Sequence, residues 1–485
     1  MIRSKIVALP RREVSKEDVK EQKQQGGLKR ELGLPAAIAM VVGSMIGSGI
    51  FTSPQNMAAA TNPKLALVAW ILTGAGTFCI VLSFSHMVEL MPFTGGAVVY
   101  SDAAFGRWGG FTIAWSYWAC AWISQASFLT AGIRYLSSIF PIFDQNGIAA
   151  FLAGSAMLWI LTVINILGVK KAGYVQVVTT ICKLLPVVLF ILLAIFNFNA
   201  ANFNTVSSPA MNDTGTLSGG AAIAMWAFLG FEMAAVPAGE TKNAGKNLKN
   251  AVLYGFIFVA IIYFIVGFLA SGVLPQARLA KSTAPFADMI NFMTGGRWAG
   301  IFVSLFVLIS VLGAANGNVI VTSRTAYAAT QRRMFPDIFG EINPKFGTPV
   351  KNMVINAILT NCVLVLNCVQ SLNAAFTFMI LLSTLSSMPA YLMTEGAEML
   401  FVKNKFNRIT VGKFLKSSIV PLLAFLYTLY ITFASGANTV MWGFILIMVG
   451  MPMFIYMKIK SKDTQIPKRD LQEMPETESG PKEKA

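Results

Sequence analysis

The sequence predicts an all-α polytopic membrane protein with twelve transmembrane helices, and three features of the chain lead to this fold class. The 485 residues are 55% hydrophobic and only 12% charged, which is about half the charged fraction of an ordinary soluble domain. The apolar residues are gathered in long runs without charge. The Lys and Arg residues are concentrated between alternate runs.

The charge-free runs give the number of helices, because an apolar run of about 18 residues or more is long enough to span a bilayer. Single-helix runs cover residues 34–63, 65–88, 108–133, 145–169, 184–212, 250–277 and 298–323. An eighth, 214–231, continues past Glu232 to Gly239. The runs 352–394 and 417–457 are each about twice the length that one helix needs. We expect each to fold back, near Ser371 and near Gly436, which gives twelve helices.

The basic residues set the predicted orientation. Of the 38 Lys and Arg residues, all but six fall in segments that are cytoplasmic if the N-terminus is cytoplasmic. Five lie in outer loops, and one lies within a span; in order they are Lys64, Arg134, Lys183, Arg278, Lys281 and Arg297. This bias places both termini in the cytoplasm of a cell with the protein in its cytoplasmic membrane. The net charge of +16 therefore indicates topology and not a nucleic-acid partner.

The predicted organisation is one transporter-sized domain between two charged arms. Residues 1–33 and 461–485 are expected to be disordered cytoplasmic tails, the first lacking the apolar region of a signal peptide. Residues 34–460 hold the twelve helices. The only histidine, His86, argues against a metal site or haem, and no cofactor is expected. The five cysteines lie in spans without metal spacing and are assigned to packing: Cys79, Cys120, Cys182, Cys362 and Cys368.

Two helices are interrupted by glycine, and they lie five helices apart. Helix 1 contains Gly47-Ser48-Gly49 after Gly43-Ser44, and helix 6 contains Gly230 before Glu232, with Pro237 and Gly239 downstream. Interruptions at corresponding positions of two halves are typical of a solute-binding site at the bilayer midplane. The pattern predicts inverted repeats at about 34–200 and 214–403, with helices 11 and 12 (about 413–460) appended.

A break inside the bilayer has chemical consequences, because lipid cannot satisfy the freed N–H and C=O groups and the break must face a polar cavity. The half-helix that starts near Ser48 would direct its N–H groups and positive dipole end at a carboxylate. The half-helix that ends near Leu229 would offer carbonyls to an ammonium. Together they fit the headgroup of an α-amino acid. The simpler alternative is a small-residue packing face formed by Gly43 and Gly47.

These segments resemble the amino acid–polyamine–organocation superfamily over residues 33–460. Residues 42–51 (VGSMIGSGIF) are similar to its helix-1 signature, and residues 226–232 (WAFLGFE) with 240–243 (ETKN) to its helix 6. Residues 117–125 (YWACAWISQ) look like helix 3 of arginine/agmatine exchangers. Asn316-Gly317, Ser323-Arg324 and Phe335-Pro336 look more like L-type exchangers.

The resemblance implies a LeuT-type 5+5 fold with helices 1 and 6 broken, and it implies a set of site residues. The substrate headgroup would lie on Ser44, Gly47, Ser48 and Gly49, with Trp226 and Leu229 in the helix-6 wall, and with Tyr117, Gln125 and Asn318 shaping the side-chain pocket. Arginine exchangers carry a gating tryptophan where this chain has Asn318, which counts against arginine. Lys183 in helix 5 is shared instead with L-type and proton-coupled members.

Glu232 and Lys183 are the ionisable residues most clearly within spans, where an unpaired charge costs several kcal/mol. Glu232 is interpreted as a gating hydrogen bonder, a proton acceptor or a counter-ion for a cationic substrate. Its structural alternative is to accept hydrogen bonds from backbone N–H groups freed by the break. By resemblance, Lys183 would approach helices 1 and 8 and hold carbonyls of the broken helix, coupling transport to protons. Its alternative is snorkelling to the headgroups.

Other polar and aromatic residues of the spans receive plainer interpretations. Trp115, Trp118 and Trp122 recur at helical spacing and are expected to pack along one face of helix 3. Glu395 and Glu398 are expected to be solvated charges at the cytoplasmic end of helix 10. Arg324, Arg332 and Arg333 are expected to act as topology determinants at the end of helix 8.

The function implied by the resemblance is secondary transport of a cationic or neutral amino acid, or its decarboxylated amine, by exchange. A proton-coupled symporter using Lys183 is the main alternative, and a homodimer is compatible with the sequence. A channel would need repeated polar rings, which are not seen. An intramembrane enzyme would need a nucleophile–base pair or metal ligands, and the spans hold too few suitable residues. A sensor that uses the same fold without transport stays open.

Overall fold

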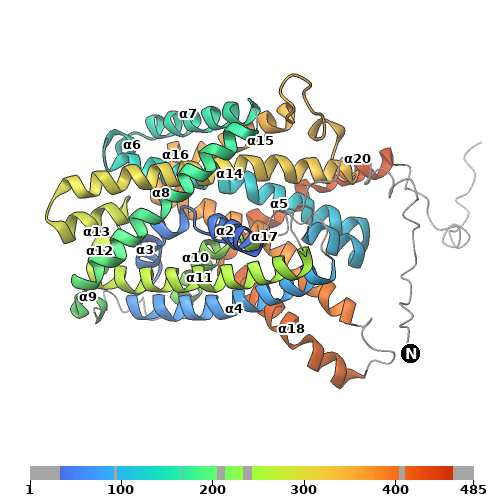
Figure 1. Ribbon diagram of the computed structural model, residues 1–485, viewed down its shortest axis with the longest axis horizontal. Coiled ribbons are helices and arrows are strands. Elements are labelled where there is room, and N and C mark those ends of the chain that lie inside the picture. Colours follow the sequence, from blue (N-terminus) through green and yellow to red (C-terminus); the bar gives the residue numbers. More distant parts are fainter. Residues whose placement is uncertain are drawn as a thin grey trace, which may run out of the picture.

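A computed structural model of the chain describes residues 33–91, 96–167, 169–204, 214–232, 243–402 and 410–461. These residues form helices and connecting turns, and their only β-structure is an isolated bridge between Asn343 and Thr348. Figure 1 shows the long helices α4 (Pro63–Leu90), α11 (Ala244–Val273) and α14 (Arg297–Gln331) running along the longest dimension of the molecule. The predicted all-helical fold is therefore confirmed for the described residues.

The first half of the chain contains two short helices in place of an uninterrupted helix 1, followed by long helices with short connecting ones. The remaining elements are α2 (Leu34–Met45), α3 (Gly49–Ala60), α5 (Ala97–Ser137), α6 (Ile142–Gln145), α7 (Gly147–Ile166), α8 (Val169–Phe196), α9 (Ala200–Asn204) and α10 (Thr214–Phe228). The second half repeats this alternation of long and short elements. Besides α11 and α14, the elements of the second half are α12 (Gln276–Leu279), α13 (Pro285–Thr294), η4 (Asp337–Phe339), α15 (Val350–Leu364), α16 (Leu366–Val369), α17 (Leu372–Val402), α18 (Val411–Ala434), α19 (Ala437–Val449) and α20 (Met451–Lys460).

Nine segments of the described residues are long and apolar enough to cross a membrane. The three remaining predicted spans fall on α5, α8 and α10. The apolar parts of α8 and α10 are shorter, Lys183–Phe196 and Leu217–Phe228, and α5 carries many small and polar residues. The molecule is thus a multi-pass membrane protein, while the total of twelve spans stays a prediction.

The two predicted fold-backs are confirmed. The run 352–394 turns between α16, which ends at Val369, and α17, which begins at Leu372. The run 417–457 turns at Gly436, whose φ of +85° lies in the region that glycine alone adopts readily. Both turns follow from length alone. An apolar run that is about twice as long as one spanning helix can stay in the bilayer only if the chain turns back near its middle.

Two predicted spans have different limits in the structure. Helix 3, expected at 108–133, is part of the 41-residue α5, which begins before the kink at Gly106 (φ +75°). The charge-free run of helix 5 begins at Leu184, whereas α8 begins at Val169 and includes Lys183, which was predicted to lie within this span. In both cases a charged residue ended the charge-free run. Lys183 lies inside the continuous helix α8, whereas Arg107 directly follows the kink at Gly106, where the backbone of α5 leaves the helical conformation. Charge-free runs therefore underestimate helices that extend beyond the apolar layer.

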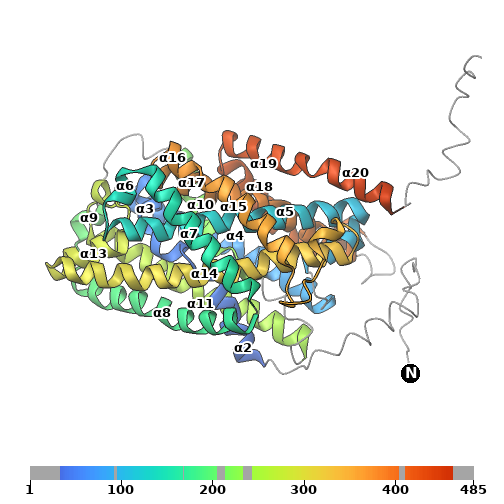
Figure 2. The ribbon, with the colours of Figure 1, turned by 90° about the horizontal axis from the view of Figure 1, so that it is seen from above.

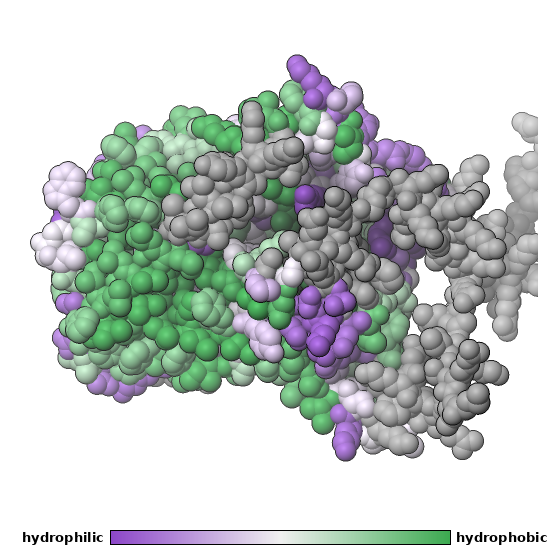
Figure 3. All heavy atoms as spheres, viewed as in Figure 1, coloured by the Kyte–Doolittle hydropathy of each residue, from purple (hydrophilic) through white to green (hydrophobic). Residues whose placement is uncertain are grey.

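The connecting helices separate the two ends of the molecule. In Figures 1 and 2, α9, α12 and α13 lie together at one end, and α20 ends at the opposite one. This separation agrees with the predicted alternation of loops across the membrane. In that prediction residues 200–204 and 276–294 lie on one side, and the C-terminal end of helix 12 lies on the other. Figure 3 shows a broad hydrophobic surface on the molecule. Helices α8 and α11 expose large apolar side chains such as Val188, Leu192, Ile257 and Ile261, as lipid contact requires.

Helix α5 is central to the packing, since it contacts α14, α17, α15 and α7. The predicted tryptophan stripe is confirmed as packing: Trp115, Trp118 and Trp122 are each at most 9% exposed and belong to one buried cluster. Two indole groups also donate hydrogen bonds, from Trp115 Nε1 to Leu446 O (2.8 Å) and from Trp118 Nε1 to Asn356 Oδ1 (2.7 Å). The stripe therefore fixes α5 against neighbouring helices.

The expectation that Glu395 and Glu398 are solvated is wrong. Glu395 is 0% and Glu398 6% exposed, and both lie on the inner side of α17. Thr428 donates to Glu395 at 3.0 Å, and Glu398 lies 2.8 Å from His86 Nδ1. A helix-end position in the sequence does not reveal that α4 and α18 cover this part of α17.

Two further expectations about side chains need correction. Arg134, counted among the outer-loop residues, lies in the last turn of α5 and is 0% exposed. Cys362 and Cys368 are exposed, so the assignment of all cysteines to internal packing fails for these two, whereas Cys79 and Cys120 are half-buried. The side chain of Cys182 lies outside the described residues.

The start of α7 provides a test of the packing. A Cβ on Gly147 would lie 2.5 Å from Asn367 O and 2.9 Å from Cys368 Cα. Because these are backbone atoms of α16, Gly147→Ala should destabilise the protein by about 1–3 kcal/mol. The measurement is the thermal unfolding temperature of the purified protein in detergent.

The matched control is Gly74→Ala in the interior of α4, where a Cβ would meet nothing within 4 Å. This change should raise stability by about 0.5–1 kcal/mol, since alanine favours a helix interior over glycine. Equal melting temperatures for the two variants would contradict the close contact between α7 and α16.

Candidate functional site

The break in helix 1 is the first element of the candidate site. Helix α2 ends at Met45 and α3 begins at Gly49, with Ile46 (φ −79°, ψ 83°) leaving the helical conformation between them. The first N–H groups of α3 lack partners within the helix, as at any helix start. Ser48 precedes α3 and is fully buried, and its Oγ has no hydrogen-bond partner in the described part of the chain. The predicted half-helix that starts near Ser48 is therefore present.

The end of α10 is the second element. Helix α10 stops at Phe228, and Gly230 follows with φ +109°, a conformation that strains any residue with a side chain. The N–H group of Gly230 donates to Glu232 Oε2 at 3.1 Å. The structure thus shows the N-terminal side of the break in helix 6. Its continuation, including Pro237, Gly239 and the 240–242 part of the motif, lies outside the described residues.

The two breaks are in contact. Ser44 Oγ lies 2.9 Å from Gly230 O and 2.8 Å from Val41 O, so its single proton is shared between the two helices. A Cβ on Gly230 would be 3.0 Å from Ser44 O, and a Cβ on Gly49 would be 3.2 Å from Trp226 and 3.3 Å from Ala227 Cα. The glycines are therefore required for this close approach of α2, α3 and α10.

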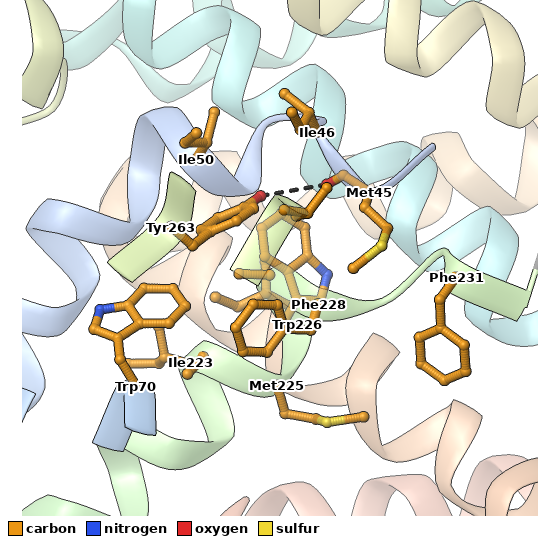
Figure 4. Packing of buried hydrophobic residues seen from close by; sticks show 14 of the residues in the cluster. Met45, Ile46, Ile50, Trp70, Ile223, Met225, Trp226, Phe228, Phe231 and Tyr263 are labelled. Atoms are coloured by element: carbon orange, nitrogen blue, oxygen red, sulfur yellow. Dashed lines mark hydrogen bonds between the residues drawn. The ribbon is translucent and has the colours of Figure 1, made fainter. Parts of the chain in front are cut away.

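A tyrosine of α11 spans the break in helix 1. Tyr263 donates from its hydroxyl to Met45 O, the last carbonyl of α2, at 3.3 Å, as Figure 4 shows. A Cβ on Gly49, the first residue of α3, would lie 2.9 Å from the same hydroxyl. In the same view, Trp226 lies beside Tyr263 and the unwound segment. The hydroxyl of Tyr263 thereby bonds the end of α2 and lies against the start of α3.

Lys183 contacts helix 1 from α8. Its side chain is 1% exposed, and Nζ donates to Gly43 O at 2.9 Å. The ammonium therefore points to the last turns of α2 and does not extend to the surface, so snorkelling does not describe its position. A charged donor on a backbone carbonyl near the break partly compensates the cost of removing the ammonium from water.

The residues predicted to shape the side-chain pocket come from α5 and α14. Asn318 Nδ2 donates to Gln125 Oε1 at 2.9 Å and to Ala121 O at 2.7 Å. The remaining donor of Gln125, Nε2, and the hydroxyl of Tyr117 are buried without a hydrogen-bond partner among the described residues.

The structure brings the predicted site residues together in two connected groups. The first holds Ser44, Gly47, Ser48, Gly49, Trp226, Leu229 and Gly230 at the two breaks. The second holds Tyr117, Gln125 and Asn318. Phe128 lies on α5, the helix that carries Tyr117 and Gln125, and contacts the first group, because a Cβ on Gly47 would lie 3.4 Å from its ring and its centroid is 6.3 Å from that of Trp226.

Sequence analysis missed several residues of this region. Phe128 and Phe376 pack on Trp226, the latter with centroids 5.6 Å apart. Tyr263 holds the break, and Tyr391 stacks on Phe231 at 5.5 Å. A hydroxyl in the middle of an apolar span was the available signal for the two tyrosines. No such signal distinguishes the two phenylalanines from ordinary lipid-facing ones. Within the described ranges, no three His, Cys, Asp or Glu side chains gather as metal ligands would.

The fold and the site together define a multi-pass membrane protein with discontinuous helices at its centre. The chain belongs to the amino acid permease family, whose family model matches residues 32–459. This confirms the resemblance to the amino acid–polyamine–organocation superfamily. The family indicates a transporter of small molecules rather than an enzyme.

Individual relatives cover nearly the same length. The chain is 31% identical to an arginine/agmatine antiporter of Chlamydia caviae over 452 residues, which are 90% of this chain and 92% of the relative. It is 30% identical to an arginine/agmatine antiporter of Chlamydia felis, with the same coverage. It is 28% identical to a putative amino-acid transporter of Clostridium perfringens over 88% of this chain and 91% of the relative.

Glu232 offers a test of the site, since its bond to the Gly230 N–H supports the structural role. Glu232→Gln keeps an oxygen that accepts this bond and removes the charge, whereas Glu232→Ala removes both. We expect amino-acid uptake by the Gln variant within about threefold of wild type, and a loss of about tenfold or more in the Ala variant. Initial uptake rates in liposomes measure both.

Glu89→Gln removes the same charge at the end of α4, where Glu89 pairs with Lys249, and should leave uptake close to wild type. An equally large loss in Glu232→Gln and Glu232→Ala would contradict the structural role. It would assign Glu232 to proton transfer or to charge recognition of the substrate.

Proposed function

We propose that this protein exchanges amino acids across the cytoplasmic membrane by alternating access. The observation that carries the proposal is the contact between the two helix breaks, where Ser44 Oγ lies 2.9 Å from Gly230 O. Around this contact, Ser48, Tyr117 and Gln125 keep buried polar atoms without a partner in the described part of the chain. Buried polar groups are normally satisfied, so a polar ligand is the natural partner for all three.

The headgroup of the substrate would be divided between the two breaks. The N–H groups at the start of α3, together with Ser48 Oγ, suit a carboxylate. The carbonyls at the end of α10 suit an ammonium. Gly47 and Gly49 allow the backbone itself to approach the ligand, and Trp226 and Leu229 would cover it from helix 6. This arrangement selects an α-amino acid and leaves the side chain to a separate pocket.

The side-chain pocket would lie between α5 and α14. Tyr117, Gln125 and Asn318 line it with hydroxyl and amide groups, which suit a cationic or neutral polar side chain better than an acidic one. The chlamydial relatives are named arginine/agmatine antiporters, so exchange of an amino acid for its decarboxylated amine is the transport mode that we favour. Because Asn318 offers no aromatic surface, arginine itself need not be the preferred substrate.

The same proposal includes the architecture that this mode of transport requires. Twelve spans would form two inverted repeats, at about 34–200 and 214–403, with helices 11 and 12 at about 413–460. Both termini, including the arms 1–33 and 461–485, would be cytoplasmic. Support comes from the broken helices in corresponding positions and from α9, α12 and α13 lying opposite the end of α20 (Figure 1).

The direct test is uptake of radiolabelled amino acids into liposomes that contain the purified protein. A panel of arginine, lysine, ornithine, serine, leucine and glutamate, with and without unlabelled amino acid inside, gives both the substrate class and the mode. We expect uptake of a cationic or neutral amino acid to be at least about tenfold faster with internal substrate, since an exchanger returns loaded. Equal uptake into empty and loaded vesicles would contradict exchange, and the absence of any uptake would contradict transport.

A proton-coupled symporter is the second candidate, and the contact of Lys183 Nζ with Gly43 O favours it. Gain or loss of a proton on this amine would change the strength of its bond to helix 1 next to the substrate site. Under this mechanism uptake into empty vesicles rises with an inward proton gradient. Protonation of Lys183 would then be linked to closure of the break.

The Lys183→Ala variant tests this candidate through the pH dependence of transport. If Lys183 carries the proton, the variant should lose its response to a proton gradient, because no group at Gly43 O then titrates. Lys281→Ala, which removes an exposed lysine, should keep the wild-type response. A Lys183→Ala protein whose uptake kept the full pH dependence would rule out coupling through this residue.

A further inference from the structure

Arg134 is the buried charge that the proposed transport mechanism does not use. It lies in the last turn of α5, next to the segment that connects α12 and α13, and its side chain is 0% exposed. The guanidinium is therefore enclosed by protein at the predicted outer end of the site. Arginine is rarely buried without a counter-ion.

Among the described residues, the guanidinium contacts only neutral groups. Nε donates to Thr283 O at 3.1 Å, and Nη2 donates to Gln55 Oε1 at 2.6 Å. The ring of Phe376 lies 4.8 Å from Cζ. The third nitrogen, Nη1, has no hydrogen-bond partner among the described residues.

Carboxylates near Arg134 do not neutralise it. No Asp or Glu of the described residues forms an ion pair with it. Asp288 accepts a hydrogen bond from Ser282 Oγ at 2.5 Å instead, and Asp144 acts on the guanidinium only at longer range. The charge is thus left without an anion while one of its donor nitrogens is unused. A planar guanidinium in this condition is a strong receptor for a carboxylate, which it binds with two parallel hydrogen bonds.

The position of Arg134 relates it to the central site. Phe376, on which the guanidinium stacks, also packs on Trp226 with centroids 5.6 Å apart. Gln55 belongs to α3, the half-helix whose start forms the predicted carboxylate site. Gln55 also donates to Ala280 O at 3.0 Å, so it joins α3 to the α12–α13 segment. A solute leaving the two breaks toward this end would meet the Phe376–Arg134 pair next.

We propose that Arg134 forms a second, outer site for the carboxylate of the transported amino acid, closed in this structure by Gln55 and Thr283. The inference rests on the proposed function, because it assumes amino-acid transport through the central breaks. When α3 and the α12–α13 segment separate, Gln55 and Thr283 leave the guanidinium and a carboxylate replaces them. The site distinguishes an amino acid from an uncharged ester or a decarboxylated amine, which offers no such anion.

The experiment is a thermodynamic cycle in which Arg134 is changed in the protein and the carboxylate is changed in the ligand. Competition in the liposome assay measures the effect of each change. The amino acid with the fastest exchange in the panel is the label, and that amino acid and its methyl ester are the external competitors. The ester keeps the side chain and the ammonium and lacks the carboxylate charge. The quantity compared is the half-inhibitory concentration of the ester divided by that of the free amino acid. In wild type this ratio measures how much the carboxylate contributes to binding at all sites.

In Arg134→Gln this ratio should shrink by about tenfold, because the variant loses a charge-assisted pair that only the free acid can make. Arg278→Gln is the matched control, since it removes the same charge from an exposed position at the same end, and it should keep the wild-type ratio. A purely structural effect of Arg134 would weaken acid and ester together. An unchanged ratio in Arg134→Gln therefore overturns the outer site.

A second variant keeps the inference testable if Arg134→Gln does not fold. Gln55→Ala retains the guanidinium and removes its neutral competitor, so the ratio should grow by about two- to tenfold. A ratio that stayed constant or fell in this variant would overturn the proposal. Wild-type vesicles without any uptake would overturn the proposed function itself, whereas normal wild-type exchange with unchanged ratios would overturn the outer site alone.

Discussion

The structure depends on one constraint: backbone groups freed inside a membrane-embedded protein must find partners within it. The break at residues 46–48 frees carbonyls of α2 and N–H groups of α3, and the end of α10 frees more. Ser44 and Glu232 engage the freed groups around Gly230, while Tyr263 and Lys183 engage those around α2. The broken helices are thus stabilised by side chains from each other, from α8 and from α11.

This arrangement leaves some polar atoms near the two breaks without hydrogen-bond partners in the described part of the chain. The side chains that hold the backbone each make a hydrogen bond to it, whereas Ser48, Tyr117 and Gln125 keep unpaired polar atoms among the described residues. A scaffold that is satisfied at its backbone and unsatisfied at a few side chains is stable by itself and still gains free energy from a polar ligand. The division explains how a transporter can be folded in the absence of substrate and remain selective for it.

Much of this could be predicted from the sequence. Length and charge predicted both fold-backs and the nine membrane-spanning segments found among the described residues, since bilayer thickness fixes helix length. Glycine within two spans placed the breaks, because few other residues allow φ +109° at Gly230 or the close approach at Gly49. The motifs predicted that Gln125 and Asn318 lie close together, although not that they form a hydrogen bond with each other.

The remainder depends on tertiary contacts that no local pattern encodes. Arg134 and Glu395 stand near the ends of apolar runs, where a charge is usually solvated, and both are 0% exposed because other helices cover them. In the sequence Phe128 and Phe376 look like any other phenylalanine of an apolar span. Only their packing against Trp226 assigns them to the candidate site. A helix end in the sequence therefore does not identify a solvent boundary in a bundle whose neighbouring elements extend past it.

The interruption of helix 1 also divides its anchoring. The α2 half is held by Lys183 of α8 and packs on α11, whereas the α3 half is held by Tyr135 of α5, whose hydroxyl donates to Phe51 O at 2.6 Å, and by Arg134 through Gln55. The side-chain hydrogen bonds of the two halves thus come from different helices, whereas Tyr263 of α11 lies against both halves at the break. A movement of one half relative to the other would change the backbone torsions of residues 46–48 and the contacts of the Tyr263 hydroxyl. The interruption is consequently the point at which helix 1 can bend.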